Sequence, residues 1–184
     1  MEPRHDGVEV VEAPAPVSPD LRDEIGRLRL AVWSGEGSLD VSLFPTGVWW
    51  DALDEAEGSR HWVVCGGPGN TTVVAAARLT WHPSFEDGYR DVELWKKAGV
   101  DLPLPTCDLG RLVVRSDFRG RGLAQQLNAA RVAAARAMGA RSVIATASDG
   151  NARLLRKIGF FDIGQSIVFA DRPSTTFHAL QLNF

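Results

Sequence analysis

The chain has 184 residues, of which 45% are hydrophobic and 23% are charged, and its formal net charge at pH 7 is −3. These values are typical of one folded domain that can bury a substantial core, and we treat residues 1–184 as that single domain. The negative charge argues against nucleic acid as a partner, because binding to a phosphate backbone needs a basic face.

Cysteine usage and the start of the chain bear on its compartment. Two cysteines, Cys65 and Cys107, are too few for a disulfide framework and favour a reducing compartment, where each is a small core residue. Residues 1–6 show no basic and then apolar pattern of a signal peptide, and no apolar run reaches membrane-spanning length. The sequence therefore predicts a cytoplasmic protein that has no membrane partner.

The first half of the chain predicts two helices and a hairpin. Residues 1–20 are proline-rich and hold a candidate first strand at 8–12, and Asp20 is a candidate cap for a helix over 21–33. A second, short helix is predicted over 49–56. Two apolar runs then form a hairpin, at 61–65 and 72–80, around the glycine-rich segment 66–70.

The residues in and beside these helices allow two interpretations. Three tryptophans either line a substrate pocket or fill the core, namely Trp33, Trp49 and Trp50. Three aspartates either bind a cationic acceptor or are solvated and capping, namely Asp40, Asp51 and Asp54. The long stretch 81–105, with a candidate helical turn at 92–98, is predicted to form a lid or wall of an acceptor site.

The central part of the chain changes character twice. Residues 109–114 are apolar and partly β-branched, which predicts a strand. Residues 123–138 carry apolar side chains at the spacing of one helical face, which predicts a helix. Between them, Gly120 and Gly122 can adopt backbone angles that are closed to other residues.

This strand, turn and helix together predict an anion site. The first turn of a helix has main-chain N–H groups without intrahelical partners, the helix dipole adds positive charge, and Arg119 and Arg121 add more. A plain strand-to-helix turn is the alternative. A dinucleotide-binding loop would have a third glycine where Gln125 stands, and a Walker loop would need a lysine followed by serine or threonine. The Arg-Gly-Arg-Gly run is also found in RNA-binding segments, but here it stands alone in an acidic chain.

The last part of the chain completes a mixed sheet. Gly139 is predicted to end the long helix, and residues 142–147 form the next strand. A short helix follows over 148–158, and the segments 160–170 and 175–184 look like a final antiparallel pair. Strands interleaved with helices predict a mixed α/β fold.

The same residues resemble those of the GNAT N-acetyltransferase family. Residues 119–124, Arg-Gly-Arg-Gly-Leu-Ala, fit the family signature Arg/Gln-x-x-Gly-x-Gly/Ala. Residues 108–114 look like its fourth strand, and 154–160 look like the end of its fourth helix and the following turn. The resemblance covers 106–161 and implies a mixed, mostly antiparallel sheet flanked by helices, with this segment as the acyl-CoA-binding core.

The resemblance implies the ligands as well. Acetyl-CoA or another acyl-CoA is the expected co-substrate, no metal is expected, and the expected partner is a small-molecule or peptide amine, with a homodimer as an open alternative. The residues implied to bind coenzyme A come from the strand, the loop and the two helices after it: Leu112, Val113, Val114, Arg119, Gly120, Arg121, Gly122, Leu123, Ala124 and Asn151.

The implied chemistry is direct attack of the amine within a ternary complex. Asp108 matches the position where many relatives carry a glutamate and is the candidate base, with a structural strand-end carboxylate as the alternative. Arg111 either orients the acceptor or pairs with an acid. The tyrosine that usually protonates the leaving thiolate is replaced by Leu155, and the single tyrosine is Tyr89, so Ser148 or water is the candidate substitute.

Three functions are compatible with these patterns. The first is an N-acetyltransferase. The second is a synthase that takes a longer acyl chain from coenzyme A or from an acyl carrier protein, as acyl-homoserine lactone synthases do. The third is a coenzyme A-binding sensor without turnover, which the missing tyrosine at position 155 suggests.

Overall fold

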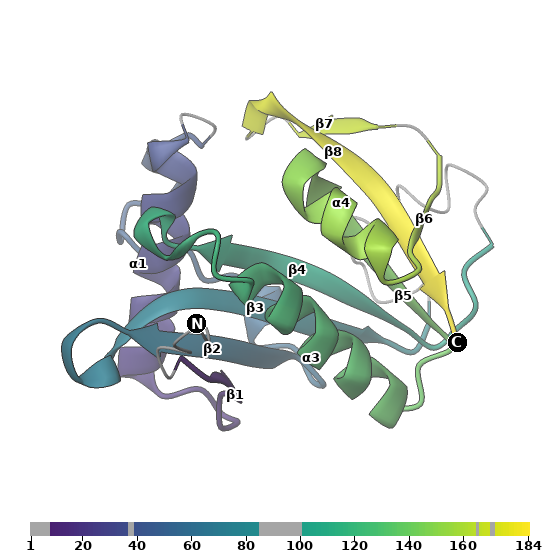
Figure 1. Cartoon of the computed structure of the whole chain (residues 1–184), viewed down its shortest axis with the longest axis horizontal. Coiled ribbons are helices and arrows are strands. Elements are labelled where there is room, and N and C mark those ends of the chain that lie inside the picture. Colours follow the sequence, from purple (N-terminus) through teal and green to yellow (C-terminus); the bar gives the residue numbers. More distant parts are fainter. Residues whose placement is uncertain (1–7, 37–38, 85–100, 165, 170–171) are drawn as a thin grey trace, which may run out of the picture.

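The computed structural model describes residues 8–36, 39–84, 101–164, 166–169 and 172–184. Its helices are α1 (Pro19–Gly35), α3 (Leu123–Ala137) and α4 (Asp149–Lys157). Its strands are β1 (Val10–Glu12), β2 (Arg60–Gly66), β3 (Thr72–His82), β4 (Thr106–Val114), β5 (Ser142–Ser148), β6 (Phe161–Asp162), β7 (Ile167–Phe169) and β8 (Arg172–Asn183). In the described residues, these eight strands form one sheet in the order β1-β2-β3-β4-β5-β8-β6, with β7 also paired to β8 (Figure 1).

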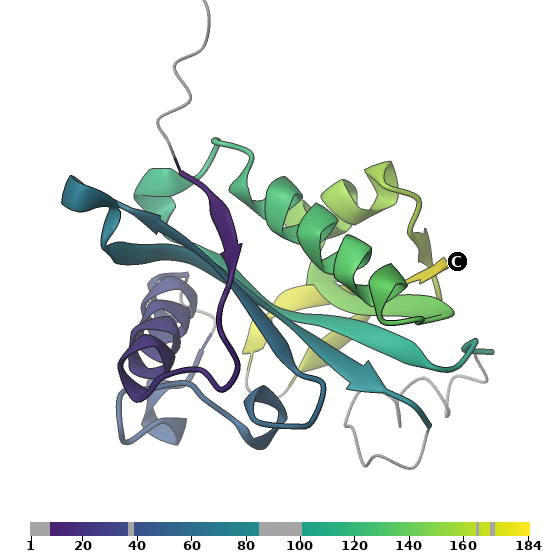
Figure 2. The same cartoon turned by 90° about the horizontal axis from the view of Figure 1, so that it is seen from below.

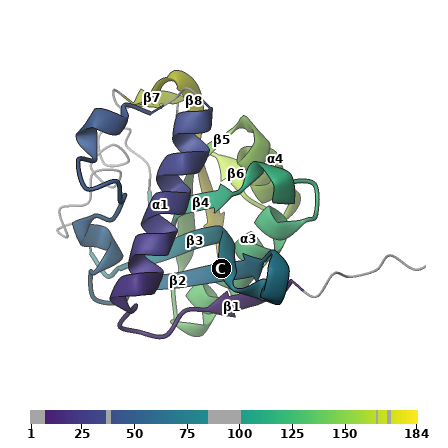
Figure 3. The ribbon, with the colours of Figure 1, turned by 90° about the vertical axis from the view of Figure 1, so that its left-hand side faces the viewer.

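The sheet is mostly antiparallel and is covered on both faces. Among its ladders only β4 and β5 run parallel, within the described residues. Helix α1 lies on one face, and α3 and α4 lie on the other (Figures 2 and 3). Alternate residues of β2 point to opposite faces: Val63 packs with Ile25 and Leu28 of α1, whereas Val64 belongs to the cluster with Leu127 of α3. The predicted mixed sheet with flanking helices is confirmed.

Strand β4 contains a bulge that opens the sheet. Its pairing with β3 shifts register between Ala76 and Arg78, and Arg111 takes a left-handed φ of 54° there. A bulge bends its strand, and this one lies beside Gly110. Strand β4 pairs with β5 only from Thr106 to Asp108, so the two parallel strands separate beyond the bulge.

Several sequence predictions need correction. Helix α1 begins earlier than predicted and is capped by Ser18, whose hydroxyl accepts from the amide of Leu21, because Pro19 at the first helical position suits the cap before it. The predicted helix over 49–56 is only a short 3-10 turn, Ala52–Asp54, because Asp51 and Asp54 form a capping box that tightens the chain there.

The end of the chain differs from prediction in its details. The segment 160–170 is not one strand: it is divided into β6 and β7, which both pair with β8. Gly139 has a φ of 84° directly after α3, which confirms its predicted role at the helix end. The predicted lid or wall over 81–105 lies largely in residues 85–100, outside the described residues, as does its helical turn at 92–98. The described part of the chain holds no helix with the length and apolar character needed to cross a membrane.

Candidate functional site

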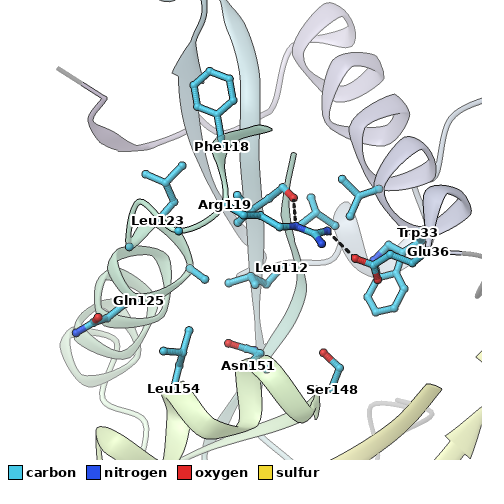
Figure 4. A pocket seen from close by; sticks show the side chains of 17 residues that line it. Trp33, Glu36, Leu112, Phe118, Arg119, Leu123, Gln125, Ser148, Asn151 and Leu154 are labelled. Atoms are coloured by element: carbon cyan, nitrogen blue, oxygen red, sulfur yellow. Dashed lines mark hydrogen bonds and ion pairs between the residues drawn. The ribbon is translucent and has the colours of Figure 1, made fainter. Parts of the chain in front are cut away.

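A cavity of about 570 Å³ opens between the carboxyl end of α1, the end of β4, the loop after it and the start of α4. Figure 4 shows side chains from these four elements pointing into the same space. Nine of the ten residues predicted to bind coenzyme A line it, namely Leu112, Val113, Val114, Arg119, Gly120, Gly122, Leu123, Ala124 and Asn151. The elements that are separated in the sequence therefore meet at one groove.

The glycine loop forms one end of this groove. Gly120 and Gly122 both have a φ of 77°, which residues with a Cβ rarely adopt. The first main-chain bond of α3 runs from the amide of Gln126 to the carbonyl of Gly122, so the amides of residues 123–125 have no acceptor within the helix. A Cβ at Gly120 would meet no atom within 4 Å, so the space over the loop is open to a ligand.

The two arginines of the loop differ in their surroundings. Arg119 donates from Nε to the carbonyl of Val114 and forms an ion pair with Glu36 at the end of α1, across the groove (Figure 4). Arg121 does not line the cavity: its guanidinium lies 4.6 Å from the ring centroid of Phe118 and donates to the carbonyl of Asp117. Of the two arginines, Arg119 therefore lines the groove and Arg121 does not.

The far end of the groove is formed by the start of α4. Ser148 is the residue before α4 and makes no side-chain hydrogen bond to cap it, and both Ser148 and Asn151 line the cavity. The amide of Asn128 on α3 donates to Oδ1 of Asn151 at 2.7 Å, and Asn128 in turn accepts from Nη2 of Arg131. Asn151 is therefore held at a fixed orientation by a chain of side chains from α3.

Arg131 links this chain of side chains to the bulge. It is fully buried, and its Nη1 donates to the carbonyls of Arg78 at 2.9 Å and Gly110 at 3.1 Å. Burial lowers the pKa of its guanidinium to about 9, which is far above neutral, so the group remains charged. A second, smaller cavity of about 70 Å³ begins where the groove ends, and the two share Trp33, Leu112, Ser148 and Asn151.

The small cavity lies where β4 and β5 separate. Leu109 and Arg111 of β4 and Thr146 of β5 face it, and Trp49 and Phe177 close it. Trp49 is placed by α1: its amide donates to the carbonyl of Gly26 at 3.3 Å, and a Cβ on Gly26 would be 2.3 Å from the side chain of Val48, so only glycine allows this approach.

A buried ionic network supports this wall of the site. Asp54 accepts a hydrogen bond from Arg29 and forms an ion pair with Arg78, and Asp51 accepts hydrogen bonds from Arg78 and Arg111. Although burial opposes ionisation, the neighbouring guanidiniums keep the pKa of Asp51 and of Asp54 well below the usual range, so both are charged. The sequence left open whether Arg111 orients the acceptor or pairs with an acid. In the structure it forms an ion pair with Asp51.

The remaining predicted site residues lie elsewhere. Asp108 is 2% exposed and lines neither cavity; its Oδ2 would be 3.2 Å from a Cβ on Gly110, on the side where Arg78 also lies. Leu155 is fully buried in the core and contributes no hydroxyl. Tyr89 falls outside the described residues.

The remaining acid and cysteine candidates are structural. Asp40 only caps a short turn through Ser42. Cys107 is buried, and burial raises the pKa of its thiol to about 12, as expected for a core residue and not for a nucleophile. No group of three or more His, Cys, Asp or Glu side chains is placed to hold a metal ion in the described part of the chain.

Two arginines at or beside the site were not identified from the sequence. Arg131 follows Leu127 and precedes Ala135 at four-residue intervals on the buried face of α3, so a charged residue within an apolar stripe was the available signal. Arg172, at the start of β8, lines the small cavity, and its guanidinium lies over Trp33, Trp49, Phe169 and Phe177. Phe169 and Phe177 lie near Arg172 in the sequence, but Trp33 and Trp49 come from distant segments, so the sequence alone did not mark Arg172.

Comparison with known proteins gives a consistent result. The model of the acetyltransferase (GNAT) family matches residues 24–160. A CoA-dependent acyl-homoserine lactone synthase, BjaI, solved with MTA, superimposes with a TM-score of 0.70 at 19% identity, over 96% of this chain and 82% of that one. An acyl-CoA N-acyltransferase from Pseudomonas aeruginosa gives 0.65 at 18%, over 95% and 98%.

A third structure, the N-acyl amino acid synthase FeeM from uncultured soil microbes, gives a TM-score of 0.66 at 13% identity, over 95% of this chain and 92% of that one. Identities this low show a shared fold and nothing finer. No curated protein sequence matches the chain.

Proposed function

The chain belongs to the acetyltransferase (GNAT) family, and on this premise we propose that it transfers an acyl group, acetyl in the first instance, from coenzyme A to the nitrogen of an amine. One observation carries the proposal: the open amides of residues 123–125 stand at one end of a groove whose other end meets a second cavity at Ser148 and Asn151. Such a groove suits a ligand with a pyrophosphate at one end and a reactive thioester at the other.

The reaction needs no covalent intermediate on the protein. The amine nitrogen attacks the thioester carbonyl carbon, a C–N bond forms and the C–S bond breaks, and the electron pair leaves on sulfur. The amine gives up a proton and the thiolate takes one, so the products are an amide and coenzyme A. The small cavity that adjoins the end of the groove would hold the acceptor, which places both substrates in one ternary complex.

Proton transfer is assigned to residues near the junction of the two cavities. Ser148 lines both cavities and is not used as a helix cap, so its hydroxyl is the proposed donor to the thiolate. Asp108 remains the proposed base and would act through water, because its carboxylate lines neither cavity. A thiol with a pKa near ~8.5 leaves without strong acid assistance, which suits a weak donor such as serine.

Acetyl is the acyl group proposed first because the family model that matches the chain is that of acetyltransferases. The second candidate is a long-chain N-acyl synthase, which the fold shared with BjaI and FeeM supports. The two candidates differ in the donor that reacts fastest.

Release of coenzyme A separates the candidates. The purified chain is given acetyl-CoA, octanoyl-CoA or an acylated carrier protein, with a broad panel of amines, and the binding of each donor is measured in parallel. Faster release from acetyl-CoA supports the proposal, and faster release from the longer donors supports the synthase. Tight binding of acetyl-CoA with no release for any amine would leave a coenzyme A sensor.

A further inference from the structure

Asn128 of α3 is buried behind the groove. It is 1% exposed and lines neither the groove nor the small cavity. Its side-chain amide lies between Arg131 on the same helix and Asn151 at the start of α4, and it forms a hydrogen bond with each of them. Asn128 therefore reaches the groove through Asn151, which lines it (Figure 4).

Arg131 is a fixed donor at the buried end of this arrangement. Its Nη1 donates to the carbonyls of Arg78 and Gly110, and its Nε donates to the carbonyl of Leu127 at 3.2 Å. These carbonyls come from β3, β4 and α3, so the guanidinium is held from three sides. Its Nη2 is directed at Asn128 and donates to Oδ1 of that residue.

A guanidinium can only donate hydrogen bonds, and this property fixes the orientation of both amides. The atom of Asn128 that faces Arg131 has to be its carbonyl oxygen, so the NH2 of Asn128 faces the other way. There it donates to Oδ1 of Asn151 at 2.7 Å. The other half of the Asn151 amide is its NH2, which donates to no protein acceptor in the described part of the chain. Asn151 therefore presents a donor to the space that it lines.

We propose that Asn128 is a positioning residue, which together with Arg131 locks the NH2 of Asn151 toward the groove, so that this point of the groove selects a carbonyl oxygen of the acyl donor. The inference rests on the proposed function for the identity of that donor. Between its pyrophosphate and its thioester, coenzyme A carries an arm with two amide groups, and each has a carbonyl oxygen that can accept a hydrogen bond.

The fixed orientation has a clear energetic consequence. An asparagine that rotates freely could offer either its NH2 or its oxygen at this point of the groove. An oxygen that faces a ligand carbonyl leaves two acceptors without a donor, which is costly where water is excluded. By fixing Asn151 before the ligand arrives, Asn128 removes this unfavourable orientation without touching the ligand.

Two substitutions of Asn128 separate the orientation of Asn151 from simple packing. Asn128→Leu removes both hydrogen bonds, so the Asn151 amide can rotate. Asn128→Asp keeps an acceptor for Arg131 but cannot donate, so Asn151 has to turn its NH2 toward the new carboxylate and its oxygen toward the groove. At pH 8 the adjacent guanidinium keeps this carboxylate ionised, even though the charge of Asp108 also acts on Arg131.

The ligands are coenzyme A and 3′-phospho-ADP, which has the same phosphates but lacks the amide-containing arm, and their affinities are measured by calorimetry. Asn128→Leu should weaken coenzyme A binding by about 3- to 10-fold, and Asn128→Asp by about 10- to 100-fold. Both variants should bind 3′-phospho-ADP as the wild type does, because an effect of the added charge would act on both ligands. Equal losses for the two ligands in a folded variant, or weaker coenzyme A binding by Asn128→Leu than by Asn128→Asp, would overturn the inference.

Asn151→Ala tests whether Asn128 acts through Asn151. It removes the donor itself and should weaken coenzyme A binding by about 3- to 10-fold. In that background Asn128→Asp should cause no further loss, because no amide is left to turn. A further loss as large as in the wild type would overturn the inference. Gln126→Leu, which removes an exposed amide of the same helix outside the groove, is the matched control and should leave both affinities unchanged.

The orientation of Asn151 can also be measured without a ligand, by NMR of the side-chain amides in isotope-labelled protein. The NH2 of Asn151 should exchange rapidly with solvent, because it faces the open groove, and that of Asn128 slowly, because it is buried and bonded. In Asn128→Asp the NH2 of Asn151 should become slow. If these exchange rates are found but the wild type does not bind coenzyme A, only the proposed function fails. Exchange of Asn151 that is unaffected by Asn128→Asp would overturn the inference.

Discussion

Arg131 of α3 donates from Nη1 to the carbonyl oxygen of Gly110 in β4, 3.1 Å away. This bond joins the helix that follows the glycine loop to the bulge that separates β4 from β5. Through Asn128, the same arginine also fixes Asn151 at the start of α4. One buried side chain therefore connects α3 with the bulge of β4 and with the start of α4.

Substitution of Arg131 by methionine should destabilise the fold strongly. The change leaves the carbonyls of Arg78 and Gly110 without their buried donor, at a cost of about 1–3 kcal/mol each. We expect a total loss of about 3 kcal/mol, measured by urea denaturation at pH 7.5. Arg136→Met, at an exposed position of the same helix, is the matched control and should change stability by less than about 0.5 kcal/mol. Equal losses in both variants would show that the bonds to the bulge are unimportant.

The role of Gly122 can be tested by comparison with Gly139, which has a similar backbone conformation. Gly122 and Gly139 have φ values of 77° and 84°, one before α3 and one after it, and a side chain at either would meet no atom closer than 3.9 Å. Gly122→Asp and Gly139→Asp should therefore cause a similar loss of stability, about 1–2 kcal/mol. Only Gly122→Asp places a negative side chain in the groove, and we expect it to weaken coenzyme A binding at least tenfold by calorimetry, with Gly139→Asp unchanged. Unaltered affinity in a folded Gly122→Asp protein would remove the loop from the binding site.

The parts of the site that follow from local chain geometry could be predicted from the sequence. The loop at Gly120 and Gly122 is determined by residues within a few positions, so glycine placement was a sufficient signal. The helix predicted over 49–56 was wrong because periodicity does not report that Asp51 and Asp54 pair with arginines 24 or more residues away.

The acceptor side could not be predicted for the same reason. The sequence left open whether Asp51 and Asp54 bind a cationic acceptor or cap a helix, and the structure shows that both form a capping box and pair with guanidiniums. These pairings depend on arginines from α1, β3 and β4. Residue types alone therefore left the role of these aspartates open, although they gave the correct fold.

Removal of the Ser148 hydroxyl should slow transfer without weakening donor binding. If the hydroxyl protonates the thiolate, Ser148→Ala lowers kcat by about 10- to 100-fold, below the upper range for general acids because water can substitute. The loss should be smallest at high pH, where the thiolate leaves unprotonated. The comparison uses single-turnover rates between pH 6 and 9, with acetyl-CoA affinity as the control. A rate loss that is independent of pH would assign Ser148 to positioning alone.

The role of Asp108 as a base can be tested over the same pH range. If Asp108 accepts the amine proton through water, Asp108→Asn should lower the rate most at low pH, where little neutral amine is present. We expect a 10- to 100-fold loss at pH 6.5 that diminishes toward pH 9. Because Asp108 is buried near Arg78, the stability of the variant must be measured first. A full rate at every pH in a folded variant would leave Asp108 a structural role only.

His61 should make the stability of the protein depend on pH below neutrality. Burial lowers the pKa of the His61 ring below its usual 6.5, so the unfolded chain binds a proton that the folded chain resists. The unfolded state therefore gains protons as pH falls through 6.5, and the free energy of unfolding decreases from there downward, with a slope of at most about 1.4 kcal/mol per pH unit for one proton. The depressed pKa values of Asp51 and Asp54 act only lower, below 3.8, so the two windows are separate. Urea denaturation at pH 7.5, 6.5, 5.5 and 5.0 should show this decrease in the free energy of unfolding. His61→Gln should reduce its dependence on pH. An identical slope in both proteins would assign the effect to other groups.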